Sequence, residues 1–129
     1  MALINTWFFT KTIIDWDILR RGTTNKFRVV SVREYCDKKN KLPDGYTLTL
    51  MILEDKLDYG SDKNGNKREN NQFQNFTATV LSREKKPIKG DIVELLDFNE
   101  ENSFAVNFDL ILRFNSCNIL KGGKNEKIV

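Results

Sequence analysis

Residues 72–83 read QFQNFTATVLSR, and the alternation in this stretch decides how the chain folds. Successive side chains of a β-strand point to opposite faces of a sheet. Phe76, Ala78 and Val80 therefore share one face, which we expect to be buried in the core. Phe73 falls on the opposite face, together with asparagine and threonine side chains. The pattern predicts a half-buried strand that carries one large apolar side chain on its outer, polar surface.

Other parts of the chain also have the pattern of β-strands. Residues 46–59 alternate, with Thr47 and Thr49 on one face and apolar side chains on the other. The sequence PDG at residues 43–45 is typical of a turn and separates this strand from an earlier one. The further strands that we expect lie at residues 25–36, 91–98 and 104–120, the last of them long enough to bend.

Five strands of this kind, with long second and third strands, predict an all-β fold, namely a small closed five-stranded barrel of the OB type. Residues 82–90, between the third and fourth strands, contain Pro87 and leave no room for a long helix. We expect one domain at residues 22–120, because 129 residues suit a single domain. Residues 121–129 contain two adjacent glycines, and we expect a flexible tail there.

Residues 1–21 form an N-terminal extension whose structure the periodicity does not decide. Helical spacing and strand spacing both fit its apolar side chains. The segment either packs on its own barrel or acts as an arm that docks on a neighbouring subunit. In the second alternative it is an oligomerisation element, and its aromatic side chains are Trp7, Phe8, Phe9 and Trp16.

Histidine is absent from the chain, and this absence excludes several kinds of active site. The sequence cannot form a Ser-His-Asp or Cys-His nucleophile arrangement or an HExxH zinc motif. The acidic residues do not converge on a metal site either, since Asp91 and Glu94 of one strand point to opposite faces. We therefore expect no enzymatic activity, no metal or other cofactor and no small-molecule substrate.

The remaining composition points to a cytoplasmic protein. Cys36 and Cys117 are isolated, which is typical of reduced thiols rather than of a secreted disulfide scaffold. No run approaches the ~20 apolar residues of a membrane helix, and the N-terminus has no leader pattern, so we expect no membrane contact. The net charge of +3 is too small to indicate a nucleic-acid binder, and such a site requires local clustering of cations.

Two aromatic residues, Tyr59 and Phe73, flank a loop of turn-forming and charged residues, 60–70. Single-stranded nucleic acid binds to such surfaces because bases stack on flat rings, which contributes about 1–3 kcal/mol per base. The pattern predicts a stacking platform. The cations that we expect to hold phosphates are Lys63, Lys67, Arg68, Arg28, Arg33, Lys85 and Lys86. Alternatively the two rings cap the barrel or pack against another subunit, and the loop charges are only solvated.

Three stretches resemble bacterial single-stranded-DNA-binding proteins: residues 21–30 (RGTTNKFRVV), 59–81 and 89–93 (KGDIV). In that family one aromatic ends a strand, a loop of DKxxG character follows, and a second aromatic begins the return strand. The resemblance covers residues 20–120, approximately. It implies an OB-fold that binds single-stranded DNA without sequence preference, with Tyr59 and Phe73 at the stacking positions.

The chain departs from this family in three respects. The family's helix between the third and fourth strands is missing or reduced to residues 82–90, Thr79 stands where a further aromatic is expected, and the C-terminus lacks an acidic tip. The resemblance therefore implies a specialised relative that acts in the replication or transfer of a plasmid, phage or conjugative element. We expect a homo-oligomer, and the sequence does not give its number of subunits. Two alternatives remain. One is a structural or assembly protein of a phage or conjugation machine that uses the barrel for protein docking. The other is an RNA-binding regulator, because stacking also accepts RNA.

Overall fold

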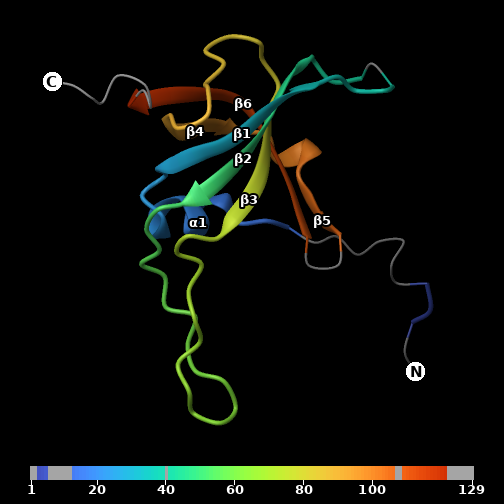
Figure 1. Ribbon diagram of the computed structural model, residues 1–129. Helices are drawn as coiled ribbons and strands as arrows, with labels where there is room; N and C mark the ends of the chain where they lie inside the picture. The colour runs from blue at the N-terminus through green and yellow to red at the C-terminus, as the bar shows by residue number, and fades with distance from the viewer. Residues whose placement is uncertain (1–2, 6–12, 40, 107–108, 122–129) are drawn as a thin grey trace, which may run out of the picture.

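The computed structural model describes residues 3–5, 13–39, 41–106 and 109–121, and it consists mainly of β-strands (Figure 1). One short α-helix precedes the first strand, and one turn of 3₁₀-helix precedes the fifth. The elements are α1 (Trp16–Gly22), β1 (Phe27–Tyr35), β2 (Gly45–Ile52), β3 (Asn75–Val80), β4 (Ile92–Phe98), η2 (Glu100–Asn102), β5 (Phe104–Val106) and β6 (Asp109–Lys121).

The predicted strands are present, but several of the predicted boundaries are wrong. β2 ends at Ile52 rather than at Tyr59, because the apolar alternation stops there and residues 53–60 form no ladder. The stretch expected as one bent strand, residues 104–120, is divided into β5 and β6. These two strands pair with each other antiparallel, so this part of the chain is a hairpin.

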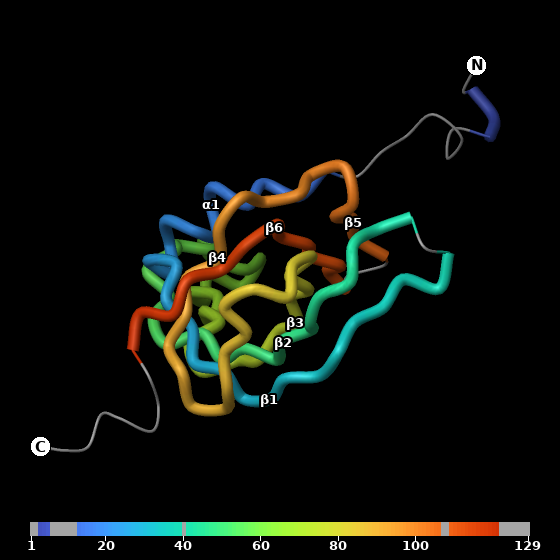
Figure 2. Tube along the Cα trace, turned by 90° about the horizontal axis from the view of Figure 1, so that it is seen from above, coloured from blue at the N-terminus to red at the C-terminus, as the bar shows by residue number. Residues whose placement is uncertain are grey.

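The sheet closes on itself. The strand order is β3-β2-β1-β4-β6-β5, and an additional pairing joins β3 to β6, so that β1, β2, β3, β6 and β4 form a ring of five strands (Figure 2). The pairing of β3 with β6 is parallel and runs from Ala78 opposite Leu112 to Val80 opposite Phe114. The other pairings are antiparallel. β5 lies outside the ring and pairs with β6.

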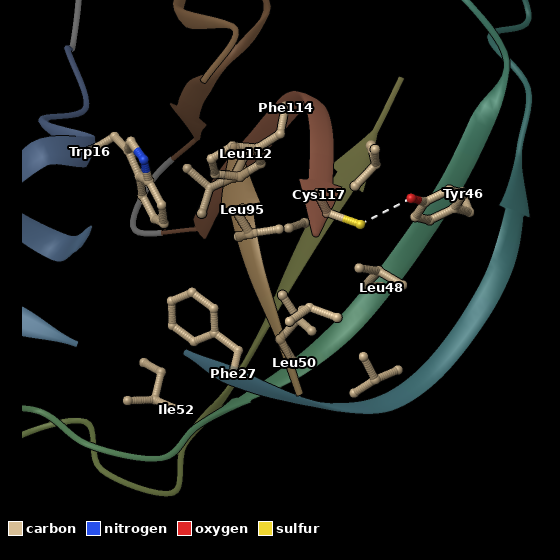
Figure 3. Close-up of a cluster of buried hydrophobic side chains, with 14 residues drawn as sticks. Trp16, Phe27, Tyr46, Leu48, Leu50, Ile52, Leu95, Leu112, Phe114 and Cys117 are labelled. Atoms are coloured by element: carbon tan, nitrogen blue, oxygen red, sulfur yellow. Dashed lines mark hydrogen bonds between the residues drawn. The ribbon is translucent and has the colours of Figure 1, made fainter. Parts of the chain in front are cut away.

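The core lies inside the ring, and the side chains that β2 and β3 contribute to it are those that the alternation predicts (Figure 3). Ala78 and Val80 of β3 have no exposed surface, and Phe76 packs against the same cluster. The buried side chains of β2 include Tyr46, Leu48, Leu50 and Ile52. The inward positions of both strands are therefore confirmed.

α1 covers one end of the ring, where β1 begins and β4 ends (Figure 1). Its first residue, Trp16, is 8% exposed. The Trp16 ring contacts the rings of Phe114, Phe98 and Phe27, with centroid separations of 4.8, 6.0 and 6.4 Å. One side chain from outside the sheet thus joins β1, β4 and β6.

For Trp16 the structure shows the first of the two alternatives for the N-terminal extension, which is packing on its own chain. Trp16 is buried and offers no free ring to a neighbouring subunit. Trp7, Phe8 and Phe9 lie outside the described residues. In the part of the chain that is described, no helix is both long enough and apolar enough to cross a membrane.

Residues 81–90 cover the opposite end of the ring without a helix. Leu81 and Pro87 are buried there. The hydroxyl of Tyr46 donates to the carbonyl oxygen of Glu84 (3.0 Å) and is also hydrogen-bonded to Cys117 Sγ (3.0 Å). A buried proline and a fixed hydroxyl therefore take the place of a covering helix.

We expect Trp16→Ala to lower the free energy of unfolding by about 3–5 kcal/mol, because a buried aromatic is removed and a cavity remains. The matched control is Ile18→Ala on the same helix, since Ile18 is 48% exposed, and its effect should stay within about 1 kcal/mol. Denaturant unfolding followed by circular dichroism measures both values. Equal effects of the two substitutions would contradict the role assigned to Trp16.

Candidate nucleic-acid interface

The segment between β2 and β3, residues 53–74, extends far from the ring (Figure 1). We call it the excursion. A single isolated bridge, between Ser61 and Lys67, links its two sides as a β-pair among the described residues. Tyr59 and Phe73 both lie in the excursion, outside β2 and β3. The prediction that one ring ends a strand and the other begins the return strand is therefore wrong.

The carboxylate of Asp55 organises one part of the excursion, residues 55–59 with residue 71, which we call the neck. Asp55 is 7% exposed, and it accepts hydrogen bonds from the N–H of Leu57 (3.0 Å), the N–H of Asn71 (2.7 Å) and the hydroxyl of Tyr59 (2.7 Å). Burial by itself raises the pKa of this carboxyl, but the three hydrogen bonds hold the pKa below its ordinary value. The charged form of Asp55 therefore joins the two sides of the excursion.

Tyr59 is half-buried, and its polar end is used within the neck. The hydroxyl that donates to Asp55 also accepts a hydrogen bond from the side-chain amide of Asn71 (2.9 Å). Burial and the bond to Asp55 raise the pKa of the Tyr59 hydroxyl. Arg68 donates to the Tyr59 carbonyl oxygen (2.9 Å). Tyr59 thus stabilises the neck through the hydrogen bonds of its hydroxyl and its carbonyl oxygen.

Phe73 is in the opposite situation. Its side chain is 64% exposed, and its φ of +69° lies in the left-handed region that favours glycine. A residue with a Cβ loses about 1–2 kcal/mol in this conformation. The backbone N–H of Phe73 donates to the Ile52 carbonyl oxygen (2.7 Å), which fixes the residue at the base of the excursion. The chain therefore holds an exposed aromatic ring in a strained conformation, and packing does not explain its presence.

The predicted cations do not gather in one place. Lys63, Lys67 and Arg68 are exposed in the outer part of the excursion, at the end of the ring that α1 covers (Figure 1). Lys85 and Lys86 belong to the segment that covers the opposite end, where Lys86 forms an ion pair with Glu34. Arg28 also belongs to this second group, because it donates to the Gly90 carbonyl oxygen (3.1 Å).

A row of polar side chains crosses the outer face of the ring. Arg33 lies opposite Thr47 in the β1–β2 pairing, Thr47 lies opposite Thr79 in β2–β3, and Thr79 lies opposite Arg113 in β3–β6. The two threonine hydroxyls are hydrogen-bonded at 3.0 Å. Because neighbouring strands are about 4.8 Å apart, the row forms a short polar strip with an arginine at each end. We call it the outer strip.

The outer strip lies in a hollow of about 330 Å³. Its lining includes the four residues of the strip together with Thr77 and residues 110–112. Sites that take small organic groups usually measure about 300–1,000 Å³. Thr79, the residue that replaces an expected aromatic, is part of this lining.

A second hollow of about 610 Å³ adjoins the first, and both are lined by Tyr35, Cys36 and Arg113. It lies between the β1–β2 loop and η2, because its lining takes residues from that loop and Asn102 from η2. The loop contributes three lysines to its lining, Lys38, Lys39 and Lys41. Cations and hollows therefore do coincide, but on this face rather than around Tyr59.

Asp37 fixes the β1–β2 loop. Its carboxylate accepts hydrogen bonds from the backbone N–H groups of Lys41 (2.9 Å), Leu42 (3.0 Å) and Lys39 (3.4 Å). The bond from Lys41 is the main cause that holds the pKa of Asp37 below its ordinary value. The backbone amides of Lys39 and Lys41 are thus held by Asp37.

Three residues of this face were not among the predicted site residues: Tyr35, Phe104 and Arg113. The guanidinium carbon of Arg113 lies 5.9 Å from the centre of the Tyr35 ring and 5.8 Å from that of Phe104. Tyr35 could have been found, because it follows Arg33 at strand spacing. Arg113 could not, because its place beside Thr79 depends on the parallel pairing of β3 with β6.

Comparisons of the chain with protein-family models, with curated proteins and with solved structures find no match.

We expect Asp55→Ala to speed hydrogen exchange of the Asn71 and Leu57 amides by about tenfold or more, because bonds to a buried charge contribute about 1.5–3 kcal/mol. Amides of β1 should exchange as in the wild type. Asp58→Ala is the matched control, since Asp58 is exposed and accepts from Gly60 alone among the hydrogen bonds of the described residues. Unchanged exchange in Asp55→Ala would contradict the role of Asp55.

The same contact should depend on pH. Because the native pKa of Asp55 is lowered, its contribution is complete above the unfolded value of about 3.9 and is lost as pH falls through the native pKa. The NMR shifts of the Asn71 and Leu57 amides, followed from neutral pH downward, should move together at a midpoint below about 3.9. A midpoint above about 3.9 would mean that the native pKa of Asp55 is raised rather than lowered, and would contradict the prediction.

Proposed function

We propose that this protein binds single-stranded nucleic acid, with DNA as the first ligand to test, on an OB-type barrel. The ring of five strands, closed by the parallel pairing of β3 with β6, supports this barrel type. In OB-folds the face of the second and third strands, with the loops between strands 1 and 2 and strands 4 and 5, binds oligonucleotides. The corresponding surface here carries the outer strip, β5 and the β1–β2 loop. We call this loop the lysine loop, because it contains Lys38, Lys39 and Lys41.

The outer strip is the observation that carries the proposal. Arg33 and Arg113 can pair with phosphates in a bidentate manner, and the hydroxyls of Thr47 and Thr79 can donate to phosphate or base edges. None of these groups recognises one particular base, because a single strand presents phosphate at every nucleotide. This chemistry favours binding without sequence preference.

The excursion provides a second contact region. Phe73 offers an exposed ring, and Lys63, Lys67 and Arg68 offer cations beyond it. Together the two regions form the minimal combination of stacking surface and basic groove that single strands require. We further propose that the protein acts as a homo-oligomer in the cytoplasm, during replication or transfer of a mobile genetic element.

One observation favours protein docking as a second candidate function. Phe104 and Val106 of β5 share one face of the β5–β6 hairpin and are 43% and 49% exposed. Exposed apolar side chains that gather in one place are typical of a protein contact. An assembly protein would use this hairpin and would bind no oligonucleotide.

Fluorescence anisotropy with labelled poly-dT, poly-U and duplex DNA distinguishes these functions. We expect the wild type to bind poly-dT, with log affinity falling against log salt at a slope of about −3 to −4 for four to six phosphate contacts. Arg33→Gln should weaken binding several-fold and reduce that slope by about 1. Arg20→Gln is the matched control, because Arg20 pairs with Asp17 on α1 and is not part of the outer strip. Preference for poly-U would indicate an RNA ligand, and no binding to any of the three would refute the proposal.

We expect Phe73→Gly to change stability and affinity in opposite directions. Glycine relieves the positive φ, so the melting temperature should rise by a few degrees, for a gain of about 0.5–1 kcal/mol. Loss of the ring should weaken binding of poly-dT about fivefold or more. Phe73→Trp keeps a ring at the same place and should retain affinity. Lower stability with unchanged affinity in Phe73→Gly would instead make the ring a packing residue.

A further inference from the structure

Arg113 combines three features that the outer strip alone does not explain. Its guanidinium lies over the rings of Tyr35 and Phe104 at the same time. Its Nη1 donates to the Asn102 carbonyl oxygen (2.7 Å). Its Nε is buried and has no hydrogen-bond partner among the described residues. A buried donor without a partner is uncommon and calls for a physical explanation.

The ring surfaces that Arg113 covers are surfaces on which a nucleobase would stack. A guanidinium and a base are both flat, and both are attracted to the face of an aromatic ring. Tyr35 is half-buried and lines both hollows at Arg113, and Phe104 is 43% exposed, so solvent reaches both residues. In the free protein, Arg113 therefore occupies the place of a base.

The contacts that hold Arg113 in this place are individually weak. Cation–π contacts at partly exposed sites and a single bond to a carbonyl oxygen contribute little each. The unpartnered Nε lowers the stability of this arrangement further. Phosphate accepts from two guanidinium donors at once, in charge-assisted bonds that are roughly twice as strong as neutral ones. The guanidinium of Arg113 can therefore leave the two rings and pair with a phosphate at a small cost in free energy.

We propose that Arg113 is a resident substitute for a nucleobase. When a single strand binds, a base takes the ring faces of Tyr35 and Phe104, and the displaced guanidinium pairs with a neighbouring phosphate of the same strand. The second hollow gives room for the base, and the lysine loop along its edge favours passage of the backbone there. This inference rests on the proposed function and adds to it a defined base position and the residue that regulates access to it.

The exchange gives Arg113→Met a distinctive dependence on salt. Methionine keeps an unbranched apolar stem but has no charge, so one phosphate contact is lost and the rings are vacated. At about 50 mM salt the variant should bind poly-dT at least threefold more weakly than the wild type, and its salt slope should be smaller by about 1. At about 500 mM salt, where phosphate pairing contributes little, the variant should bind as tightly as the wild type or more tightly.

Four further variants complete the experiment. Tyr35→Leu and Phe104→Leu should weaken binding by a similar factor at both salt concentrations, because stacking does not depend on counterion release. Arg113→Lys keeps the charge and should keep the wild-type slope, which also tests the idea if Arg113→Met folds poorly. Arg20→Met is the matched control and should equal the wild type in affinity and slope.

The outcomes separate the inference from the proposed function. A weaker Arg113→Met at both salt concentrations would make Arg113 a fixed contact and would overturn the exchange. An unchanged slope together with a lower melting temperature would make it a structural bridge between β1 and β5, and would also overturn the exchange. If the wild type binds no oligonucleotide, the proposed function and this inference both fall.

Discussion

The parallel pairing of β3 with β6 is the contact on which the rest of the molecule depends. Three residues of β3 meet three of β6, and the central pair is Thr79 with Arg113. The pairs on either side point inward, and all four of their side chains are buried. A single short ladder therefore closes the ring, completes the core and places Arg113 at one end of the outer strip. Without it β3 would be an edge strand and Arg113 would have no threonine beside it.

Closing a ring leaves two open ends, and this chain covers each end with little material. Trp16 covers one end from a helix of seven residues, and Pro87 covers the other from an irregular segment. Both solutions use one rigid, bulky side chain instead of a long helix. The excursion differs from these two ends, because it combines a stabilising and a destabilising feature. Asp55 stabilises its neck, whereas Phe73 is held at a positive φ that lowers stability. Strain at an exposed residue is more easily understood as a requirement of binding than of folding.

The sequence was a good guide wherever one local rule acted alone. Period-two alternation located the strands and the inward side chains of β2 and β3, because both depend on the same local geometry. It failed at Tyr59 and Phe73, where hydrogen bonds to Asp55 and Ile52 replace the ladder. Local patterns also cannot show which distant strands meet, so Arg113 was missed although Arg33, its counterpart across the strip, was not. The pattern of cations along the chain misled for the same reason, since it could not show that the group at residues 63–68 and the pair at residues 85–86 lie at opposite ends of the ring.

Because the net charge is small, the proposed binding of nucleic acid requires a defined face of the protein. With 21 basic and 18 acidic side chains, the protein has no general attraction for phosphate, so affinity has to come from where the charges lie. Acidic residues gather near α1 and η2, namely Asp15, Asp17, Glu100 and Glu101. Under the proposed function, these carboxylates would disfavour a polyanion beside α1, whereas the lysines that line the second hollow would favour it there. In a more basic protein the same contacts would add to a diffuse attraction, whereas in this protein they would direct a single strand to one side of the ring.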